Sequence, residues 1–343
     1  MTRGSGFGCG WGVGMVEFFC SHIDLSVLPV ALKGRMLHML AAEGNHLTVL
    51  PDWLGEMASL QQLYLDNNEI GVLPEWIGEL TDLQALSIHK NKLAKLPYSL
   101  WSLSKLQTLS VGSNSVGTVS AGIGRLRELR ALYIHDMGLQ EVPAELGQLG
   151  KLEILDLGHN QLTALPEEMG NLTGLKGFLY LSNNRLRALP NSFSQLKSLQ
   201  YLNFTDNRFT VFPAMVAEME NLQELRFYNN QIESLPDEIG DLGRLRELYA
   251  QNNHLRALPE GIGRLSKLTH LDLRNNRLTQ LPESIGALKE LVFLDLRGNR
   301  LRELPAVIGD LPHLQKLDLR WNRLAAVPEW MGELRDRGCF VYL

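Results

Sequence analysis

The hydrophobic positions of this chain recur with a period of 23 residues over most of its length. If the first Leu of each copy is numbered 1, Leu at positions 4 and 6 alternates with variable residues at positions 3, 5 and 7. This alternation predicts a β-strand, because successive side chains of a strand point to opposite faces of the sheet. We therefore expect one short strand per copy, with buried leucines and exposed variable positions.

Thirteen copies align, with first positions at residues 37, 60, 83, 106, 129, 152, 176, 199, 222, 245, 268, 291 and 314. The step is 23 residues everywhere except between 152 and 176, where the segment LKGFLYLSNN carries one extra residue around Gly177. Glycine permits the strand bulge that would absorb such an insertion. The insertion either re-aims the neighbouring Phe178 and Tyr180 for a function or is neutral at the strand entry, and both alternatives stay open.

Two further positions mark the path of the chain in each copy. Position 9 is Asn in every copy except that of Met137, and the Asn amide can pair with backbone groups where the chain leaves the strand. Position 15 is Pro in every copy except that of Ser120, which marks a return turn because Pro cannot donate to a sheet. Gly is common at position 19, where it allows a tight or left-handed backbone before the next strand.

The resulting unit, LxxLxLxxNxLxxLPxxIGxLxx, resembles leucine-rich repeat proteins of the 23-residue type. It is similar to plant intracellular Ras-group proteins, Ras-suppressor-like proteins and bacterial repeat proteins, and the resemblance covers about residues 15–343. It implies an α/β solenoid: a right-handed horseshoe with a parallel β-sheet on the concave side and short helical or 3₁₀ turns on the convex side. It also implies a protein partner, which the Ras-associated relatives suggest is a small GTPase.

The repeat boundaries suggest four segments. We expect a disordered Gly-rich N-terminus over residues 1–14 and a degenerate N-terminal capping repeat over residues 15–36. Thirteen repeats should follow over residues 37–336, with a C-terminal capping strand over residues 337–343. Caps are expected because each repeat buries its leucines only against its neighbours.

Composition narrows the class of partner. The net charge of -5 gives no general attraction to nucleic acid or to an anionic membrane. Cys9, Cys20 and Cys339 are too few and too far apart for a disulfide framework or a zinc site, and Cys20 falls on an inward position of the repeat. With no signal peptide and no apolar run of about 18 residues, we expect a cytoplasmic, soluble monomer.

The sequence carries no motif of a nucleotide-binding loop, a hydrolase or a kinase. We therefore expect no enzyme activity, no catalytic residue, no cofactor and no bound metal. One alternative remains, because His135, Asp156 and His159 fall at positions 7, 5 and 8 of neighbouring copies and could form a metal or acid/base site. Solvent-facing polar residues at variable positions explain them as well.

Aromatic residues are enriched at the outward strand positions, where six of the eight tyrosines fall. Tyr is a favoured interface anchor, because it buries a large area at a low cost in entropy. Tyr also suits any exposed strand surface, so the enrichment has two explanations. The first predicts a partner-binding surface formed by Tyr133, Asp156, Phe178, Tyr180, Tyr201, Asn203, Arg226, Tyr228, Tyr249 and Gln251.

The last three complete copies repeat a charge pattern, with Asp at position 5 and Arg at position 7. The residues are Asp272, Arg274, Asp295, Arg297, Asp318 and Arg320. Stacking of the copies would place an acidic row beside a basic row. The rows form either a secondary docking stripe for a charged partner or a pair that neutralises its own stacked charges.

These observations predict a non-catalytic scaffold that binds a protein partner on the concave face of the sheet. The alternative is a substrate-recognition module of a bacterial effector or signalling enzyme whose catalytic part lies on another chain.

Overall fold

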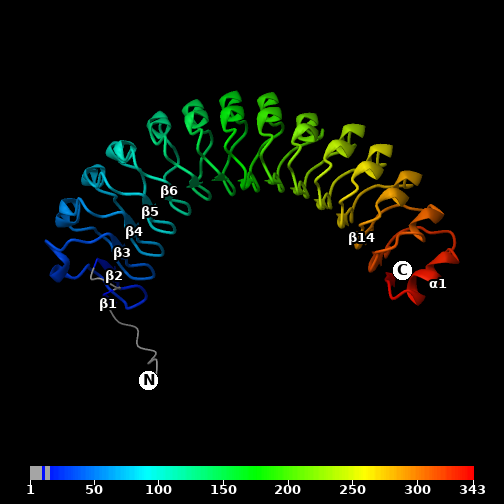
Figure 1. The fold of residues 1–343 in the computed structure, drawn as a ribbon, viewed down its shortest axis with the longest axis horizontal. Helices are drawn as coiled ribbons and strands as arrows, with labels where there is room; N and C mark the ends of the chain where they lie inside the picture. Colours follow the sequence, from blue (N-terminus) through cyan, green and yellow to red (C-terminus); the bar gives the residue numbers. More distant parts are fainter. Residues whose placement is uncertain (1–9, 12–15) are drawn as a thin grey trace, which may run out of the picture. The chain divides into compact units, whose positions relative to one another are not determined.

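The computed structural model describes residues 10–11 and 16–343, and it forms two compact units, residues 1–162 and 163–343. In each unit, taken by itself, the strands line the inner side of a curved stack and the 3₁₀ helices line its outer side (Figure 1). Each copy supplies one strand and one return turn. The predicted repeat solenoid, with a parallel sheet opposite short 3₁₀ turns, is therefore confirmed.

The described part of the first unit contains eight strands in sequence order. They are β1 (Gly10–Trp11), β2 (Glu17–Phe19), β3 (Met39–Ala41), β4 (Gln62–Tyr64), β5 (Ala85–Ser87), β6 (Thr108–Ser110), β7 (Ala131–Tyr133) and β8 (Ile154–Asp156). β1 pairs antiparallel with β2, and each later strand pairs parallel with the next. Cys9 and the rest of the expected disordered segment, residues 1–9 and 12–14, lie outside the described residues.

The 3₁₀ helices of the first unit are η1 (Val30–Leu32), η2 (Asp52–Glu56), η3 (Glu75–Glu79), η4 (Tyr98–Ser102), η5 (Ala121–Arg125) and η6 (Ala144–Gln148). Each begins directly after a Pro, except η5, which follows Ser120. Pro suits this place because its fixed φ leads the extended chain into the turn. The Pro ladder therefore marks the return path, as predicted.

The second unit contains strands β9 (Phe178–Tyr180), β10 (Tyr201–Asn203), β11 (Glu224–Arg226), β12 (Glu247–Tyr249), β13 (His270–Asp272), β14 (Phe293–Asp295), β15 (Lys316–Asp318) and β16 (Phe340–Tyr342). All neighbouring pairs are parallel, and β16 extends the sheet beyond the last repeat. The turns are η7 (Glu167–Asn171), η8 (Asn191–Gln195), η9 (Ala214–Glu218), η10 (Asp237–Asp241), η11 (Glu260–Arg264), η12 (Glu283–Ala287) and η13 (Ala306–Ile308), followed by α1 (Trp330–Asp336).

The inward positions of each strand form the core. Leu63, Leu86 and Leu248 at position 4 are fully buried, and Leu65 and Leu273 at position 6 are as well. The neighbouring strands pair in register at the repeat spacing, so that Leu225 stands opposite Leu248 and then Leu271. Cys20 is fully buried, which confirms its prediction as a small core residue.

The Asn ladder satisfies backbone groups that the turn leaves open. Asn253 is 3% exposed, and its Nδ2 donates to the carbonyl oxygens of Ala250 and of Phe227 in the preceding copy, each at 3.1 Å. Its Oδ1 accepts a hydrogen bond from the backbone N–H of Ile232 at 3.0 Å. This arrangement recurs along both units and confirms the structural role predicted for position 9.

None of the described glycines at position 19 has a left-handed backbone. A Cβ added to Gly240 would lie 2.2 Å from the carbonyl oxygen of Gly261 on the neighbouring turn. At Gly240 the two neighbouring 3₁₀ turns therefore approach to backbone contact, which leaves no space for a side chain. The left-handed alternative for these glycines is therefore wrong, and close packing between turns accounts for Gly240.

The extra residue of the irregular copy is absorbed ahead of its strand. Leu175 is fully buried, as Leu199 is one copy later, and Gly177 forms a bend between Leu175 and β9. The Gly177 carbonyl accepts the Tyr201 N–H at 3.2 Å, and Phe178 then pairs in register with Tyr201. The insertion leaves the pairing of β9 with β10 unshifted.

Among the residues that the structure describes, no helix is long and apolar enough to span a membrane.

Candidate functional site

Three aromatic rings cluster on the exposed face of the sheet at β9 and β10. Tyr201 lies with its ring centroid 5.3 Å from that of Phe178 and 5.0 Å from that of Tyr180, and Phe178 and Tyr180 stack at 5.8 Å. Phe178 and Tyr180 occupy positions 3 and 5 of one strand, and Tyr201 occupies position 3 of the next, so all three point to the same side. Phe178 remains 42% exposed, which leaves apolar ring surface open to solvent.

Arg226 connects this cluster to Tyr249. Its guanidinium lies 5.7 Å from the Tyr201 ring centroid and 4.6 Å from that of Tyr249, within the range of cation–π attraction. Glu224, two residues earlier on β11, forms a salt bridge with Arg226. Partial burial disfavours the guanidinium charge, but the bond to Glu224 outweighs this and raises the pKa of Arg226. The arginine therefore stays charged between two tyrosine rings.

Both tyrosines that flank Arg226 stay protonated at neutral pH. Burial raises the pKa of Tyr201 to about 12, even though Arg226 acts in the opposite direction. Burial also raises the pKa of Tyr249, and its hydroxyl donates to Glu247 Oε2 at 2.7 Å, which adds to the rise. Neither hydroxyl therefore adds a negative charge to this face, and the Tyr201 side chain is mostly buried, at 8% exposed.

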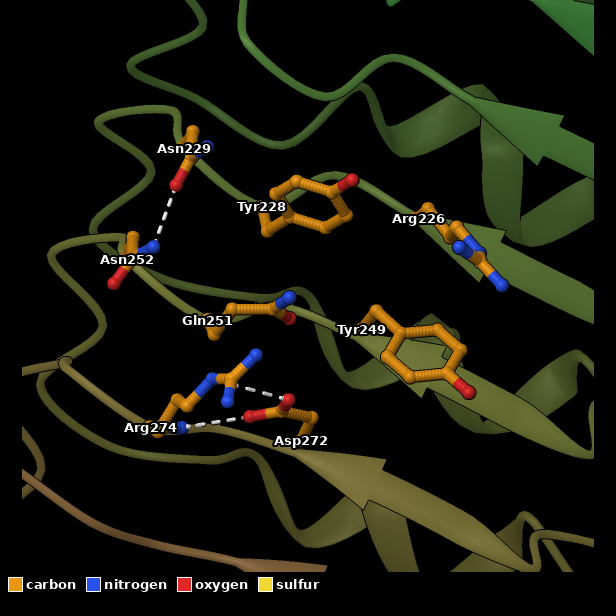
Figure 2. Close-up of a pocket in the computed structure, with 8 residues that line it drawn as sticks. All are labelled: Arg226, Tyr228, Asn229, Tyr249, Gln251, Asn252, Asp272 and Arg274. Atoms are coloured by element: carbon orange, nitrogen blue, oxygen red, sulfur yellow. Dashed lines mark hydrogen bonds and ion pairs between the residues drawn. The ribbon is translucent and has the colours of Figure 1, made fainter.

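A depression of about 380 Å³ opens on the same face beside Tyr249. Figure 2 shows its lining residues, which come from the ends of β11, β12 and β13: Arg226, Tyr228, Asn229, Tyr249, Gln251, Asn252, Asp272 and Arg274. Gln251 is only 6% exposed, and its buried Oε1 has no hydrogen-bond partner among the described residues. The depression therefore offers a buried acceptor next to two tyrosine rings.

Most residues of the predicted partner-binding surface lie on the sheet of the second unit, but Asn203 is not exposed as predicted. Asn203 is buried, its Nδ2 donates to the Tyr201 hydroxyl at 3.2 Å, and its Oδ1 accepts the Thr205 N–H at 3.1 Å. Its polar atoms thus support the cluster from within. Tyr133 and Asp156 lie in the first unit, on β7 and β8.

The contacts of the acidic and basic rows favour the second explanation, in which the two rows neutralise each other. Asp272, Asp295 and Asp318 are 4%, 1% and 0% exposed and stand opposite one another on β13, β14 and β15. Arg274 lies 3.3 Å from Asp272, Arg297 2.8 Å from Asp295 and Arg320 2.6 Å from Asp318, and Arg297 also reaches Asp318 at 3.3 Å. The arginines cover the buried carboxylates, so most of the positive charge of the arginines is neutralised by the aspartates of the same sheet.

The pKa of Asp272 is shifted in the opposite direction to that of Asp318. Burial raises the pKa of Asp272 to about 6, and Arg274 only partly offsets this. Burial also acts against ionisation of Asp318, but the hydrogen bond from Arg320 outweighs it and lowers the pKa of Asp318. The row therefore ends, beside the depression, in a carboxyl group that titrates close to neutrality.

Among the described residues, the three considered for a metal or acid/base site do not come together as a metal site. His135 Nδ1 lies 3.3 Å from Asp156 Oδ2, and the Asp156 carboxylate raises the pKa of His135. His159 is exposed, and in the described part of the chain no group of three His, Cys, Asp or Glu side chains could hold a metal ion. The predicted pair of His135 and Asp156 exists, but the third ligand does not.

Sequence reasoning missed the residues that hold this surface in place. Glu224 and Glu247 sit at position 3, each two residues before the Arg226 or Tyr249 that it contacts. Residues two positions apart on a strand point to the same face of the sheet. The spacing of each Glu from the Arg or Tyr that follows it could therefore have predicted these contacts. Position 8, treated as variable, has a left-handed backbone at Asn229 and Asn252, which explains its Asn residues.

The repeated strands, turns and Asn ladder define a repeat protein of the class that generally serves as a scaffold for protein interaction. A family model described as a leucine-rich repeat region matches residues 18–155, 113–231 and 256–336, and a second, the leucine rich repeat, matches residues 221–242. The chain therefore belongs to the leucine-rich repeat family. No curated protein matches its sequence.

Solved structures agree with this assignment. A leucine-rich repeat protein of Leptospira interrogans is 32% identical, with a TM-score of 0.69 and 95% of each chain covered. The plant peptide hormone receptor RGFR1, solved in complex with RGF2, is 28% identical with a TM-score of 0.81, covering 92% of this chain and 53% of the receptor chain. An internalin of Listeria monocytogenes is 22% identical with a TM-score of 0.77, covering 88% and 85%, which shows the fold alone.

Proposed function

We propose that this chain is a non-catalytic scaffold that binds a protein partner on the exposed face of the sheet in residues 163–343. The contact core is the aromatic cluster of Phe178, Tyr180 and Tyr201, continued by Arg226 and Tyr249. The observation that carries the proposal is the open ring surface of Phe178 in this cluster, since large aromatic side chains and arginine dominate the energetics of protein interfaces.

The local contacts support a surface that is ready to bind. Tyr201 is held by its ring contacts and by Asn203, and Arg226 is held by Glu224 between two rings. Side chains that are already ordered lose little conformational entropy on binding. The depression next to Tyr249 adds polar groups at the edge of the apolar cluster. Together they form an apolar centre with a polar rim, which is the usual anatomy of an interface.

The comparison with RGFR1 supports the choice of a polypeptide partner, since that similar repeat protein is a peptide hormone receptor solved with RGF2. The concave sheet face is our proposed location for the contact. A small GTPase, which the resemblance to Ras-group proteins implies, is one partner to include in the test.

A site-specific photo-crosslinker tests the location of binding. Replacement of Phe178 by a benzophenone amino acid should capture a partner in native lysate. The same replacement at Glu238, exposed on η10 at the outer side of the stack, should not. The double substitution Tyr180→Ala and Tyr201→Ala should reduce capture at position 178 at least tenfold while leaving the unfolding transition cooperative. Equal capture at both positions would refute the proposed surface.

A further inference from the structure

Two histidines of the first unit meet on the exposed face of the sheet. His89, Gly112 and His135 occupy position 7 of three consecutive copies, following β5, β6 and β7. The middle position carries no side chain, and a Cβ added to Gly112 would lie 2.6 Å from His135 Cε1. The His135 ring therefore lies over the Gly112 backbone. It reaches the His89 ring, and the two centroids are 5.1 Å apart with the rings tilted by 45°.

This separation fits two ligands of one ion. Two imidazoles that bind one tetrahedral zinc ion, with metal–nitrogen bonds of about 2.0–2.1 Å, have ring centroids roughly 5 Å apart. The buried Nδ1 of His89 has no hydrogen-bond partner among the described residues, and such atoms call for a water or an ion. The glycine thus allows the approach that a pair of ligands requires.

The surroundings favour a cation on this pair. Asp156 Oδ2 lies 3.3 Å from His135 Nδ1, an ion-pair contact to a buried nitrogen that makes no hydrogen bond among the described residues. An ion on this ring would therefore bind through Nε2. A carboxylate on the second nitrogen orients many metal-binding histidines and makes them stronger ligands. Asp66 adds negative charge beside His89, where its Oδ1 accepts the backbone N–H of His89 at 2.7 Å. The His135 ring therefore has a carboxylate beside it, and Asp66 adds a negative charge close to the backbone of His89.

We propose that His89 and His135 form a binding site for a divalent transition-metal ion, oriented by Asp156. The described residues supply no third ligand, so water or a partner side chain completes the coordination. Two imidazoles favour Cu²⁺ over Zn²⁺ and Ni²⁺, by the usual order of stability among these ions. This site is independent of the aromatic surface in the second unit, and neither proposal depends on the other.

The test titrates Cu²⁺ into the chelator-treated full chain and records both calorimetry and pulsed electron spin resonance. One equivalent should bind with the nitrogen modulation of two coordinated imidazoles. His89→Gln and His135→Gln should each weaken binding at least tenfold and leave the modulation of a single imidazole. A wild-type spectrum that shows fewer than two coordinated imidazoles overturns the proposal. This result needs no variant, so it does not depend on whether the variants fold.

Three further variants separate the site from other histidines. Gly112→Ala keeps both imidazoles but places a methyl group where the His135 ring lies, so it should also weaken binding at least tenfold. Asp156→Asn should weaken it about tenfold, as loss of a carboxylate behind a metal ligand does. His159→Gln should leave the affinity unchanged. An unchanged affinity in both His89→Gln and His135→Gln, or an equal loss in His159→Gln, refutes the assignment.

Discussion

The guanidinium of Arg226 lies 4.6 Å from the centroid of the Tyr249 ring on the neighbouring strand, and Glu224 holds it there. A cation over an aromatic face at a partly exposed site contributes about 0.5–1 kcal/mol. The contact therefore stabilises the sheet and keeps the arginine ordered on its surface.

Replacement of Arg226 by Gln should lower the free energy of unfolding by about 1 kcal/mol, because it removes the cation from both tyrosine rings and leaves Glu224 without its partner. Urea denaturation followed by circular dichroism measures this. Arg246→Gln provides the control, since Arg246 is an exposed residue. Equal effects of the two substitutions would contradict the importance of the ring contacts.

Substitution of Asn253 by Ala should destabilise the chain by at least about 2 kcal/mol, since it leaves the N–H of Ile232 and the carbonyls of Phe227 and Ala250 without their buried partner. Thermal and urea unfolding measure the loss. The neighbouring His254→Ala removes no contact of this ladder and should change stability by less than about 0.5 kcal/mol. A similar small change for Asn253→Ala would show that water replaces the amide.

Gly240→Ala and Gly243→Ala form a matched pair. The new Cβ at position 240 would meet the Gly261 carbonyl at 2.2 Å, whereas at position 243 the nearest atom is 4.0 Å away. We expect Gly240→Ala to destabilise the chain by about 1–3 kcal/mol through overpacking, and Gly243→Ala to leave stability nearly unchanged. Comparison of their urea midpoints tests this, and equal midpoints would contradict backbone contact between the turns.

The carboxyl group of Asp272 should make stability depend on pH. Its folded pKa of about 6 lies above the unfolded value, so the folded state binds more protons between about pH 4 and pH 6. The contribution of this group is therefore fully present below the unfolded pKa and is lost as the pH rises through 6. Relative to Asp272→Asn, the wild type should lose on the order of 2 kcal/mol over this range.

Urea unfolding of both proteins at intervals from pH 4 to pH 7 measures this difference. The carboxyl group faces Arg274, Arg297 and Asp295, which remain unchanged in the variant. A difference that is constant with pH would contradict the raised pKa, and one that grows in favour of the wild type with rising pH would show the opposite shift.

The period of 23 residues was enough to predict the strands, the turns and the buried Leu and Asn ladders, because each of these depends on a pattern that repeats. The role of Gly240 was missed, since close contact with Gly261 arises only when two turns stack. The burial of Asp295 and Asp318 beneath arginines was open for the same reason: whether a side chain on one face meets solvent or a covering neighbour depends on rotamers that sequence alone does not specify.

Of the two proposed sites, the sequence predicted the aromatic cluster but not the histidine pair. The aromatic cluster was predictable because Phe178, Tyr180 and Tyr201 share outward positions on adjacent strands. The approach of His89 to His135 was not, because it needs a glycine between them in the stack, and residues 46 positions apart do not look like neighbours in the sequence. His159 was considered because it falls at position 8 of a copy that neighbours the copy of His135, and it lies exposed in the structure.

In-register pairing has a practical consequence for the exposed face. Tyr201 pairs with Glu224, and Glu224 pairs with Glu247 one copy later. Each repeat position therefore forms a column of side chains on this face, and each copy forms a row. The bend at Gly177 leaves these columns undisturbed within the second unit. A whole 23-residue copy could then be exchanged or duplicated as a module. The exchange would change the exposed side chains of that copy and leave the alignment of the neighbouring copies unchanged.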